Sequence, residues 1–404
     1  MDDKIVLQIR KEVLNRTDLS KELSDKEIED LVAMVVAEWV HGKGFSLQER
    51  SNLIKQVFHS LRRLDVLQEF IEDHAITEIM VNGPHNIFYE KNGHLYKSSK
   101  EFSTEEKLMD IIQQIVGRHN RVVNLSSPIV DTRLEDGSRV NIVLPPVAMD
   151  GPTISIRKFP EHPLDMEHLI QNNSITPEVA DFLKKMVESR FSMFISGGTS
   201  SGKTTFLNAL TQFIPQGERV ITIEDSAELQ LIGVSNLVRL ETRNANVEEL
   251  KAITVRDLIR SALRMRPDRI IVGECRGGEA FDMLQAMNTG HDGSLSTGHA
   301  NSCRDMIGRL ETMVLMGMDL PIPAIRQQIV SGIDLIVHLG RLKDKSRRVL
   351  EIAEVDGIKD GEIQLNTLYK FQQTGCRNER IEGSLIQVGS MKHQNKKLHP
   401  VTGG

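Results

Sequence analysis

A short glycine-rich stretch constrains the fold of this chain more than any other feature. Residues Phe194–Thr205 read FISGGTSSGKTT, which places Gly197, Gly202, Lys203 and Thr204 in the pattern G-x-x-x-x-G-K-[ST]. An apolar run precedes the glycines and a segment with helical spacing follows them, which is the strand, loop and helix that this motif requires. Glycines let successive backbone N–H groups point at phosphate oxygens, and the helix N-terminus adds its dipole. The stretch predicts a phosphate-binding loop in which Lys203 reaches the β- and γ-phosphates and Thr204 ligates Mg²⁺.

The segment around this loop alternates between strand and helix patterns. Apolar runs FSMFISG, RVITIED, LVRLET, RIIVGEC and GSLSTGH are separated by loops or by helical segments such as TVRDLIRSALRM and GGEAFDMLQAM. Alternation of this kind implies an α/β domain with a largely buried parallel sheet. We expect this domain to span residues 177–372, with Thr176 as the cap of its first helix and Pro177 at the first helical position.

The residues before this domain predict two further parts. Residues 1–75 have helical periodicity, and Ser24 is expected to cap one helix; we interpret them as a helical bundle. Residues 76–160 contain short strand-like runs with hairpin signals at Asn92-Gly93 and a turn at 135–137, which predicts a small mixed α/β domain. Residues 161–176 are expected to be a linker, and residues 373–404 a tail without a recognisable motif.

Composition excludes several classes of protein. The chain has 404 residues, of which 39% are hydrophobic and 26% charged, and it has no run of about 18 apolar residues that would span a membrane. The first residues do not resemble a secretory signal, so we expect a cytoplasmic protein. Three scattered cysteines predict neither a disulfide framework nor a metal site. A formal net charge of -6 gives no reason to expect direct nucleic-acid binding.

Acidic residues follow two of the predicted strands. Glu224, Asp225 and Glu228 end the run VITIED and continue into its loop, and Glu274 follows the run RIIVG. Carboxylates at the carboxyl ends of parallel strands lie in the crevice where α/β sheets bind ligands. One of them can orient an attacking water, and Glu274 is expected at or near Mg²⁺ and its waters. The alternative for the first group is a solvated acidic loop.

Two histidines flank the run GSLST. His291 and His299 are eight residues apart and have no cysteine partner, so their spacing is a poor match to a zinc site. We expect His299 to form a hydrogen bond that senses the γ-phosphate. The alternative is a surface loop that contains two histidines.

Arginines are frequent near and within the predicted nucleotide-binding domain. Arg139 and Arg157 lie on expected strands of the preceding domain. Most arginines are solvated or form ordinary ion pairs, which is the alternative for each of them. A nucleotide hydrolase nevertheless needs positive charge on the γ-phosphate in the transition state, and an arginine from a neighbouring domain or subunit supplies it efficiently.

Several motifs in order resemble the type II/IV secretion ATPase superfamily. They are GGTSSGKTT, TIEDSAEL, RPDRIIVGECRGGEAFDMLQAMNTGHDGSLSTGHANS and DLIVH, with ITEIMVNG and RLEDGSRVNIVLPP upstream. Within the superfamily the sequence is most similar to the CpaF-type ATPases of tight-adherence (Tad, or Flp) pilus systems. The resemblance covers roughly residues 75–370. It implies an α/β fold, with a RecA-like P-loop NTPase domain preceded by a small mixed α/β (PAS-like) domain and an N-terminal helical bundle.

The resemblance also implies roles for individual residues. Glu228, in the aspartate box, is expected to activate water, and Glu274 to end Walker B. His291 and His299 form the histidine box, and Arg139 and Arg157 are expected to reach the γ-phosphate from the N-terminal domain. The expected ATP-binding residues are those of the Walker A loop: Gly197, Gly198, Thr199, Ser200, Ser201, Gly202, Lys203, Thr204 and Thr205. The expected metal ligands are Thr204 and Glu274.

Members of this superfamily are hexameric rings that use ATP and Mg²⁺ and dock on inner-membrane platform proteins. The resemblance therefore implies a homo-oligomer that is peripherally associated with the inner membrane and that assembles, or also retracts, a pilus. A secretion ATPase that transfers protein or DNA would share every catalytic motif. A nucleotide-binding switch without turnover is the non-enzymatic alternative. Cys275, which follows Glu274, is expected to react with thiol reagents only if it is exposed and deprotonated.

Overall fold

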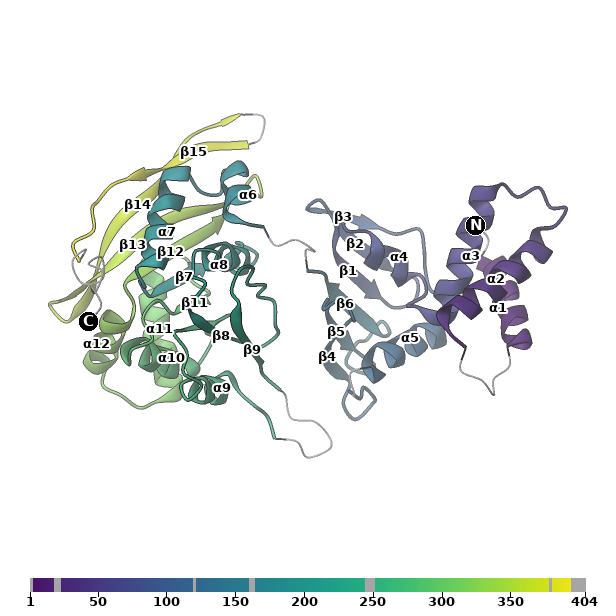
Figure 1. Ribbon diagram of the computed structural model, residues 1–404, viewed down its shortest axis with the longest axis horizontal. Coiled ribbons are helices and arrows are strands. Elements are labelled where there is room, and N and C mark those ends of the chain that lie inside the picture. Colours follow the sequence, from purple (N-terminus) through teal and green to yellow (C-terminus); the bar gives the residue numbers. More distant parts are fainter. Residues whose placement is uncertain are drawn as a thin grey trace. The chain divides into compact units, whose positions relative to one another are not determined.

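The computed structural model describes residues 3–17, 23–118, 121–159, 164–243, 251–377 and 380–393 (Figure 1). The chain divides into two compact units, Met1–Glu161 and His162–Gly404. Each unit has hydrophobic cores of its own. Among the described residues, no helix is both long enough and apolar enough to cross a membrane.

Three helices begin the first unit: α1 (Asp3–Arg16), α2 (Asp25–Val40) and α3 (Leu47–Arg62). Their apolar faces form one core that includes Ile9 on α1, Val32 on α2 and Leu53 on α3. The predicted cap at Ser24 is confirmed, because its hydroxyl accepts the Glu27 N–H while the Glu27 carboxylate accepts the Ser24 N–H. Such a reciprocal pair satisfies two N–H groups that a helix N-terminus leaves without a partner.

The rest of the first unit is a six-stranded antiparallel sheet with two helices. Its order is β3-β2-β1-β6-β5-β4. Helices α4 (Leu67–Glu72) and α5 (Glu105–Gly117) share one core with the sheet. The predicted turn at Asn92-Gly93 connects β2 to β3, and both residues have positive φ, as a two-residue hairpin turn requires. The strands are β1 (Ile76–Asn82), β2 (Ile87–Lys91), β3 (His94–Lys97), β4 (Ile129–Arg133), β5 (Arg139–Val143) and β6 (Thr153–Arg157).

The second unit is built on a nine-stranded sheet of order β15-β14-β13-β12-β7-β11-β10-β8-β9. The six strands from β12 to β9 in this order are parallel, which confirms the predicted parallel sheet. They are β7 (Met193–Gly197), β8 (Arg219–Glu224), β9 (Asn236–Glu241), β10 (Arg269–Val272), β11 (Leu295–Gly298) and β12 (Leu335–Arg341). Strand β7 lies inside the sheet, so the loop that follows it starts from a fully buried strand.

Helices cover both faces of this sheet (Figure 1). Neighbouring residues of β7 point to opposite faces: Ile195 packs with α6, α7 and α8, whereas Phe194 packs with α9 to α12. Burial on both faces explains the continuous apolar runs in the sequence. The helices are α6 (Met166–Gln171), α7 (Pro177–Glu188), α8 (Lys203–Thr211), α9 (Val255–Ala262), α10 (Glu279–Asn288), α11 (Cys303–Gly317) and α12 (Ile322–Gly332).

Three element positions differ from the sequence-based boundaries. Helix α4 lies before residue 75, yet its Leu67 and Phe70 belong to the core of the sheet. The stretch expected as a linker contains the short helix α6, because its Met166 and Leu169 are buried in the second unit. The third difference is at the C-terminus of the chain.

The described residues after 372, which are 373–377 and 380–393, are not an isolated tail. Strands β13 (Arg347–Lys359), β14 (Glu362–Arg377) and β15 (Arg380–Gln387) continue the sheet in antiparallel order. The expected domain end at residue 372 therefore falls inside β14. The end of β14 and β15 contain few strongly β-forming residues. They form strands because the neighbouring strands supply hydrogen-bond partners. Residues 394–404 lie outside the described residues.

Candidate nucleotide-binding site

The Walker A loop connects β7 to α8. Gly197 is the last residue of β7 and Lys203 the first residue of α8, which confirms the predicted order of strand, loop and helix. A Cβ at Gly197 would lie 2.5 Å from Ser201 Oγ and 2.7 Å from the Leu339 carbonyl oxygen, so only glycine fits there. Gly202 has φ of +93°, which also favours glycine. Gly198, Thr199, Ser200 and Ser201 form the loop, and Thr204 and Thr205 lie in the first turn of α8.

The Lys203 side chain is folded into the loop. It is buried, and its Nζ donates to the carbonyl oxygens of Gly198 at 3.0 Å and Gly197 at 3.3 Å. Nζ also lies 3.4 Å from His299 Nδ1. A buried ammonium at a helix N-terminus concentrates positive charge where the backbone N–H groups converge. This donor set fits the oxygens of a di- or triphosphate.

Glu274 and His299 lie at the carboxyl ends of two neighbouring strands. Glu274 follows β10 and His299 follows β11, and His299 Nε2 is 2.8 Å from Glu274 Oε1. Arg276, which the sequence analysis did not single out, donates to Glu274 Oε2 at 2.6 Å. Together with Lys203 these groups form a continuous chain of polar contacts next to the Walker A loop.

Burial lowers the pKa of His299, and the neighbouring Lys203 ammonium lowers it further, while Glu274 acts in the opposite direction. The neutral imidazole is therefore favoured, and it can donate a proton at one nitrogen and accept at the other. A neutral histidine between a carboxylate and a lysine suits a hydrogen-bonding role near phosphate.

Glu224 anchors the aspartate box. It is the last residue of β8 and is buried, and its Oε2 accepts the backbone N–H groups of Glu228 at 2.7 Å and Leu229 at 2.8 Å. Burial raises the pKa of this carboxyl to about 7, although the two N–H donors oppose the shift. Gln230, which follows Leu229, donates its N–H to Asn208 Oδ1 on α8 at 3.0 Å. The loop that carries Glu228 is thereby held between β8 and α8.

Glu224 is part of the motif TIEDSAEL, but the sequence predicts no role for it separate from that of Glu228. The sequence does hint that Glu224 is buried, because it is the last residue of an apolar run. Its contacts with the backbone of residues 228 and 229 depend on the course of the loop and are not visible in the sequence.

The structure separates the two histidines of the histidine box. Strand β11 (Leu295–Gly298) lies between them, so His291 is at the amino end of the strand and His299 at its carboxyl end. The carboxyl end of β11 is the one beside the Walker A loop, because β11 runs parallel to β7. His291 Nδ1 contacts the Ala286 carbonyl oxygen at 3.2 Å. The expectation that both histidines serve the site is therefore corrected: His291 lies at the amino end of β11, away from the Walker A loop.

The two arginines that are expected to reach the γ-phosphate, Arg139 and Arg157, are direct neighbours in the first unit. Arg139 on β5 pairs with Arg157 on β6 in the sheet register. Arg157 is exposed, and Arg139 Nη2 is 4.0 Å from Asp131 Oδ1 on β4. Like charges directly opposite each other on a sheet repel, so an anion that binds both would relieve the repulsion.

The expected metal ligands Thr204 and Glu274 both belong to the second unit. Within the part of the chain that the structure describes, no group of three or more His, Cys, Asp and Glu residues is arranged to hold a metal ion. Mg²⁺ in nucleotide sites needs only one or two protein ligands in addition to phosphate oxygens and water. A hydroxyl at the start of α8 and a carboxylate after β10 are ligands of that kind.

Cys275 does not meet the condition for reactivity. It is 1% exposed, and burial raises the pKa of its thiol far above the usual range. Its Sγ lies 3.3 Å from Met283 Sδ and 3.4 Å from Ser296 Oγ. The thiol is a packing group beneath Walker B.

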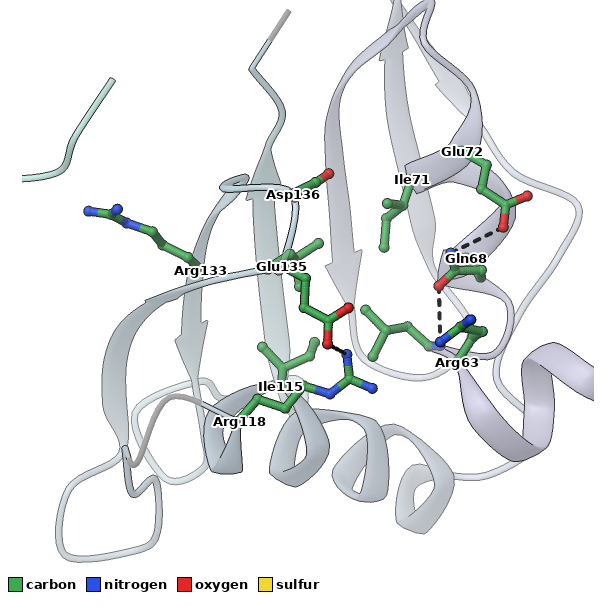
Figure 2. A pocket seen from close by; sticks show the side chains of 11 residues that line it. Arg63, Gln68, Ile71, Glu72, Ile115, Arg118, Arg133, Glu135 and Asp136 are labelled. Carbon is green, nitrogen blue, oxygen red and sulfur yellow. Dashed lines mark hydrogen bonds and ion pairs between the residues drawn. The ribbon is translucent and has the colours of Figure 1, made fainter. Parts of the chain in front are cut away.

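A separate cavity of about 380 Å³ lies in the first unit and contains none of these residues (Figure 2). Three arginines and three carboxylates line it, and Arg118 donates to Glu135 across it at 2.6 Å. A lining in which both signs of charge balance does not select polyphosphate. The lining residues are Arg63, Leu64, Gln68, Ile71, Glu72, Ile115, Arg118, Arg133, Leu134, Glu135 and Asp136.

Comparison with known proteins agrees with this geometry. The chain is 33% identical over 310 residues to the putative conjugal transfer protein Rv3659c of Mycobacterium tuberculosis, covering 75% of this chain and 87% of the relative. It is 32% identical over 321 residues to the type IV secretion system protein PtlH of Bordetella pertussis, covering 73% and 95%.

The crystal structure of the ATPase DotB of Legionella pneumophila has a similar fold, with a TM-score of 0.53 at 23% identity over 73% of this chain and 80% of DotB. The family model described as "Type II/IV secretion system protein" matches residues 61–398, which is most of the chain. The α/β fold with a RecA-like P-loop domain and the family expected from the motifs are thus confirmed. This chain belongs to the type II/IV secretion system protein family.

Proposed function

We propose that the protein is an ATP hydrolase whose active site is the Walker A loop with Glu228, Glu274 and His299. The observation that carries this proposal is the chain of contacts from Lys203 through His299 to Glu274 at the carboxyl ends of three neighbouring strands. Groups from three separate motifs converge there on a helix N-terminus. The crevice at the carboxyl ends of strands is where open α/β sheets bind nucleotides.

Each of these groups has a separate role in the proposed phosphoryl transfer. The Walker A backbone N–H groups and Lys203 bind the β- and γ-phosphates and withdraw charge from them. Thr204 and Glu274 would hold Mg²⁺, which supplies charge neutralisation at the phosphates. Glu228 orients a water molecule and accepts its proton as the water oxygen attacks the γ-phosphorus, and the bond to the leaving ADP oxygen breaks. Neutral His299 has one N–H, at Nε2, which lies 2.8 Å from Glu274 Oε1 in this structure, and we assign to it a hydrogen bond to the γ-phosphate that replaces this contact when ATP binds.

Arg139 and Arg157 complete the proposed mechanism. They are adjacent on β5 and β6, and an anion that binds both would offset their like charges. We assign to them the stabilisation of negative charge on the γ-phosphate, so that hydrolysis and release of phosphate change the position of the N-terminal domain. A group that engages only while the γ-phosphate is present is a means of converting turnover into motion.

The motor is proposed to drive assembly, or both assembly and retraction, of a Tad/Flp pilus. It would act as a cytoplasmic hexamer docked on platform proteins of the inner membrane. The similarity of its motifs to CpaF-type ATPases and its membership of the type II/IV secretion system family support this assignment. Rings with cyclic symmetry have head-to-tail interfaces, which let one subunit act on the site of the next.

A second candidate is a type IV secretion ATPase that powers transfer of protein or DNA. The relatives named PtlH and putative conjugal transfer protein favour it, at 32% and 33% identity. Deletion of the gene distinguishes the two: loss of surface pili with unchanged transfer of protein and DNA supports the first candidate, and the reverse supports the second.

Steady-state ATP hydrolysis with Mg²⁺, measured against protein concentration, tests the enzymatic proposal. We expect specific activity to rise with concentration, and Arg139→Ala or Arg157→Ala to abolish turnover while ATP still binds. Glu228→Gln should also bind ATP without hydrolysing it. Arg118→Ala is the matched control for the two arginine variants, because Arg118 is an exposed arginine of the same unit. Activity that is independent of concentration and of both arginines would exclude their role in catalysis, and wild-type protein that binds ATP without turnover would favour the switch.

A further inference from the structure

A side chain from the antiparallel extension contacts the Walker A loop. Arg347 is the first residue of β13, and its Nε donates to the Ser200 carbonyl oxygen at 2.9 Å. Its Cδ lies 3.3 Å from the position that a Cβ on Gly202 would occupy. The side chain therefore crosses the loop, although 147 residues separate Arg347 from Ser200 in the sequence.

The contact is made at a conformationally demanding residue. Ser200 has φ of 58°, in the left-handed region, which costs a non-glycine residue about 1 kcal/mol or more and requires support from its surroundings. The Arg347 Nε–H provides that support by holding the Ser200 carbonyl.

Holding this carbonyl also sets the direction of the next N–H group. In a trans peptide the C=O of one residue and the N–H of the next point in opposite directions. The Ser200 C=O points to Arg347, and the Ser201 N–H points into the loop, where it donates to the Gly198 carbonyl oxygen at 3.4 Å. Phosphate binding uses N–H groups that face into such a loop. Arg347 thus acts on the outer side of the same peptide whose inner side would face phosphate.

Arg347 is itself held in place by the hairpin that carries it. The turn between β12 and β13 is closed by Asp344, whose Oδ1 accepts from Ser346 and whose Oδ2 accepts the Ile381 N–H of β15 at 2.8 Å. The adjacent Arg348 donates to the Ile381 carbonyl oxygen at 2.7 Å. The edge strand β15 therefore fixes the turn, and the turn presents Arg347 to the loop.

We propose that Arg347 is a positioning residue for nucleotide binding, which holds the Ser200–Ser201 peptide so that its N–H faces the phosphates. This inference rests on the proposed ATP site and adds to it a residue from outside all the recognised motifs. The contact between Arg347 and Ser200 does not involve the γ-phosphate. Arg347 should therefore affect the binding of ADP and ATP equally and leave the chemical step unchanged.

Three variants separate the hydrogen bond from the positive charge. Arg347→Met keeps the aliphatic stem over Gly202 and removes the donor. Arg347→Gln places a neutral N–H donor at the same distance along the side chain as Arg347 Nε. Arg341→Met is the matched control, because Arg341 is exposed and pairs directly with Arg347 across the hairpin. The readouts are the Kd for ADP with Mg²⁺ by calorimetry, the kcat and KM for ATP, and the melting temperature without nucleotide.

We expect Arg347→Met to raise the Kd for ADP and the KM for ATP about tenfold with kcat within about twofold of wild type. Arg347→Gln should recover most of the affinity, and Arg341→Met should match wild type. A Met variant that binds like wild type would overturn the inference. So would a Gln variant as weak as the Met variant, because the charge would then be what matters. If Arg347→Met does not fold, Arg347→Ala, which also removes the donor, takes its place in the same comparison. If wild-type protein binds no nucleotide, the proposed function fails as well, whereas tight wild-type binding with unaffected variants removes only the role of Arg347.

Discussion

The carboxylate of Glu224 holds the backbone of Glu228, the residue to which we assign water activation. Glu224 Oε2 accepts the N–H groups of Glu228 and Leu229 at 2.7 Å and 2.8 Å. The Oε1 atom is buried and has no hydrogen-bond partner among the described residues. A Cβ at Gly273, next to Walker B, would lie 2.9 Å from Glu224 Cγ. One buried carboxylate thus connects the aspartate box to the residue before Glu274.

The pH dependence of stability should carry the signature of Glu224. Its pKa in the folded protein is raised from 4.5 to about 7, so the stability it contributes is fully present below pH 4.5 and is lost as the pH rises through 7. The free energy of unfolding of wild type relative to Glu224→Gln should therefore fall by roughly 3 kcal/mol between those pH values. Urea denaturation at a series of pH values measures this difference. The exposed Glu188→Gln is the control, and a wild-type curve parallel to that of Glu224→Gln would contradict the prediction.

His299 should titrate below its ordinary pKa of 6.5, because burial and Lys203 both disfavour the imidazolium. Removing Lys203 in Lys203→Ala should raise the pKa of His299, and removing the opposite charge in Glu274→Gln should lower it further. Proton NMR of the imidazole Cε1–H as a function of pH gives all three values. Shifts in the same direction in both variants would mean that the contacts do not act through charge.

Arg269 and Glu218 should be structural rather than catalytic. Arg269 is fully buried, donates through two nitrogens to Glu218, and donates to the Gly293 carbonyl oxygen at 3.3 Å. Arg269→Ala leaves the Glu218 carboxylate buried with fewer partners and should cost about 3–5 kcal/mol of stability. Arg190, which also contacts Glu218 at 3.2 Å, moderates the loss.

Chemical denaturation measures this loss, with the exposed Arg264→Ala as control. The double variant Arg269→Met with Glu218→Gln should recover part of the stability, because no buried charge remains unpaired. If Arg269→Ala were as stable as Arg264→Ala, the buried pair would not have the structural role that we assign to it.

Only one of the three cysteines should react quickly with a thiol reagent in the native state. Cys376 is exposed, whereas Cys275 and Cys303 are buried and burial raises the pKa of both thiols. Thiolates are the reactive species, so the buried pair should react only after unfolding. Counting released chromophore from Ellman's reagent before and after addition of denaturant gives the two numbers. Cys376→Ser should abolish the fast phase, and a fast phase that persists would show that Cys275 or Cys303 is accessible.

Much of the fold follows from short-range signals in the sequence. The glycine loop between an apolar run and a helical segment predicts the phosphate-binding loop, because Gly197 and Gly202 occupy positions that side chains cannot. Ser24 and Thr176 cap the helices they were expected to cap, since a cap involves residues only two or three positions away. The parallel sheet follows from apolar runs separated by helices, which reflect burial on both faces.

The tertiary structure alone decided which of these groups meet. Lys203 and His299 are 96 residues apart, and Arg347 and Ser200 are 147 apart, and each pair is joined only by the order of strands in the sheet. The parallel pairing of β11 with β7 places the carboxyl end of β11, and so His299, beside the Walker A loop, and leaves His291 at the other end of the strand. The sequence by itself determined the chemistry available at each strand end, because residue type and local spacing set it. Strand order and direction determined which ends lie together, because these depend on pairing between distant segments that no local pattern encodes.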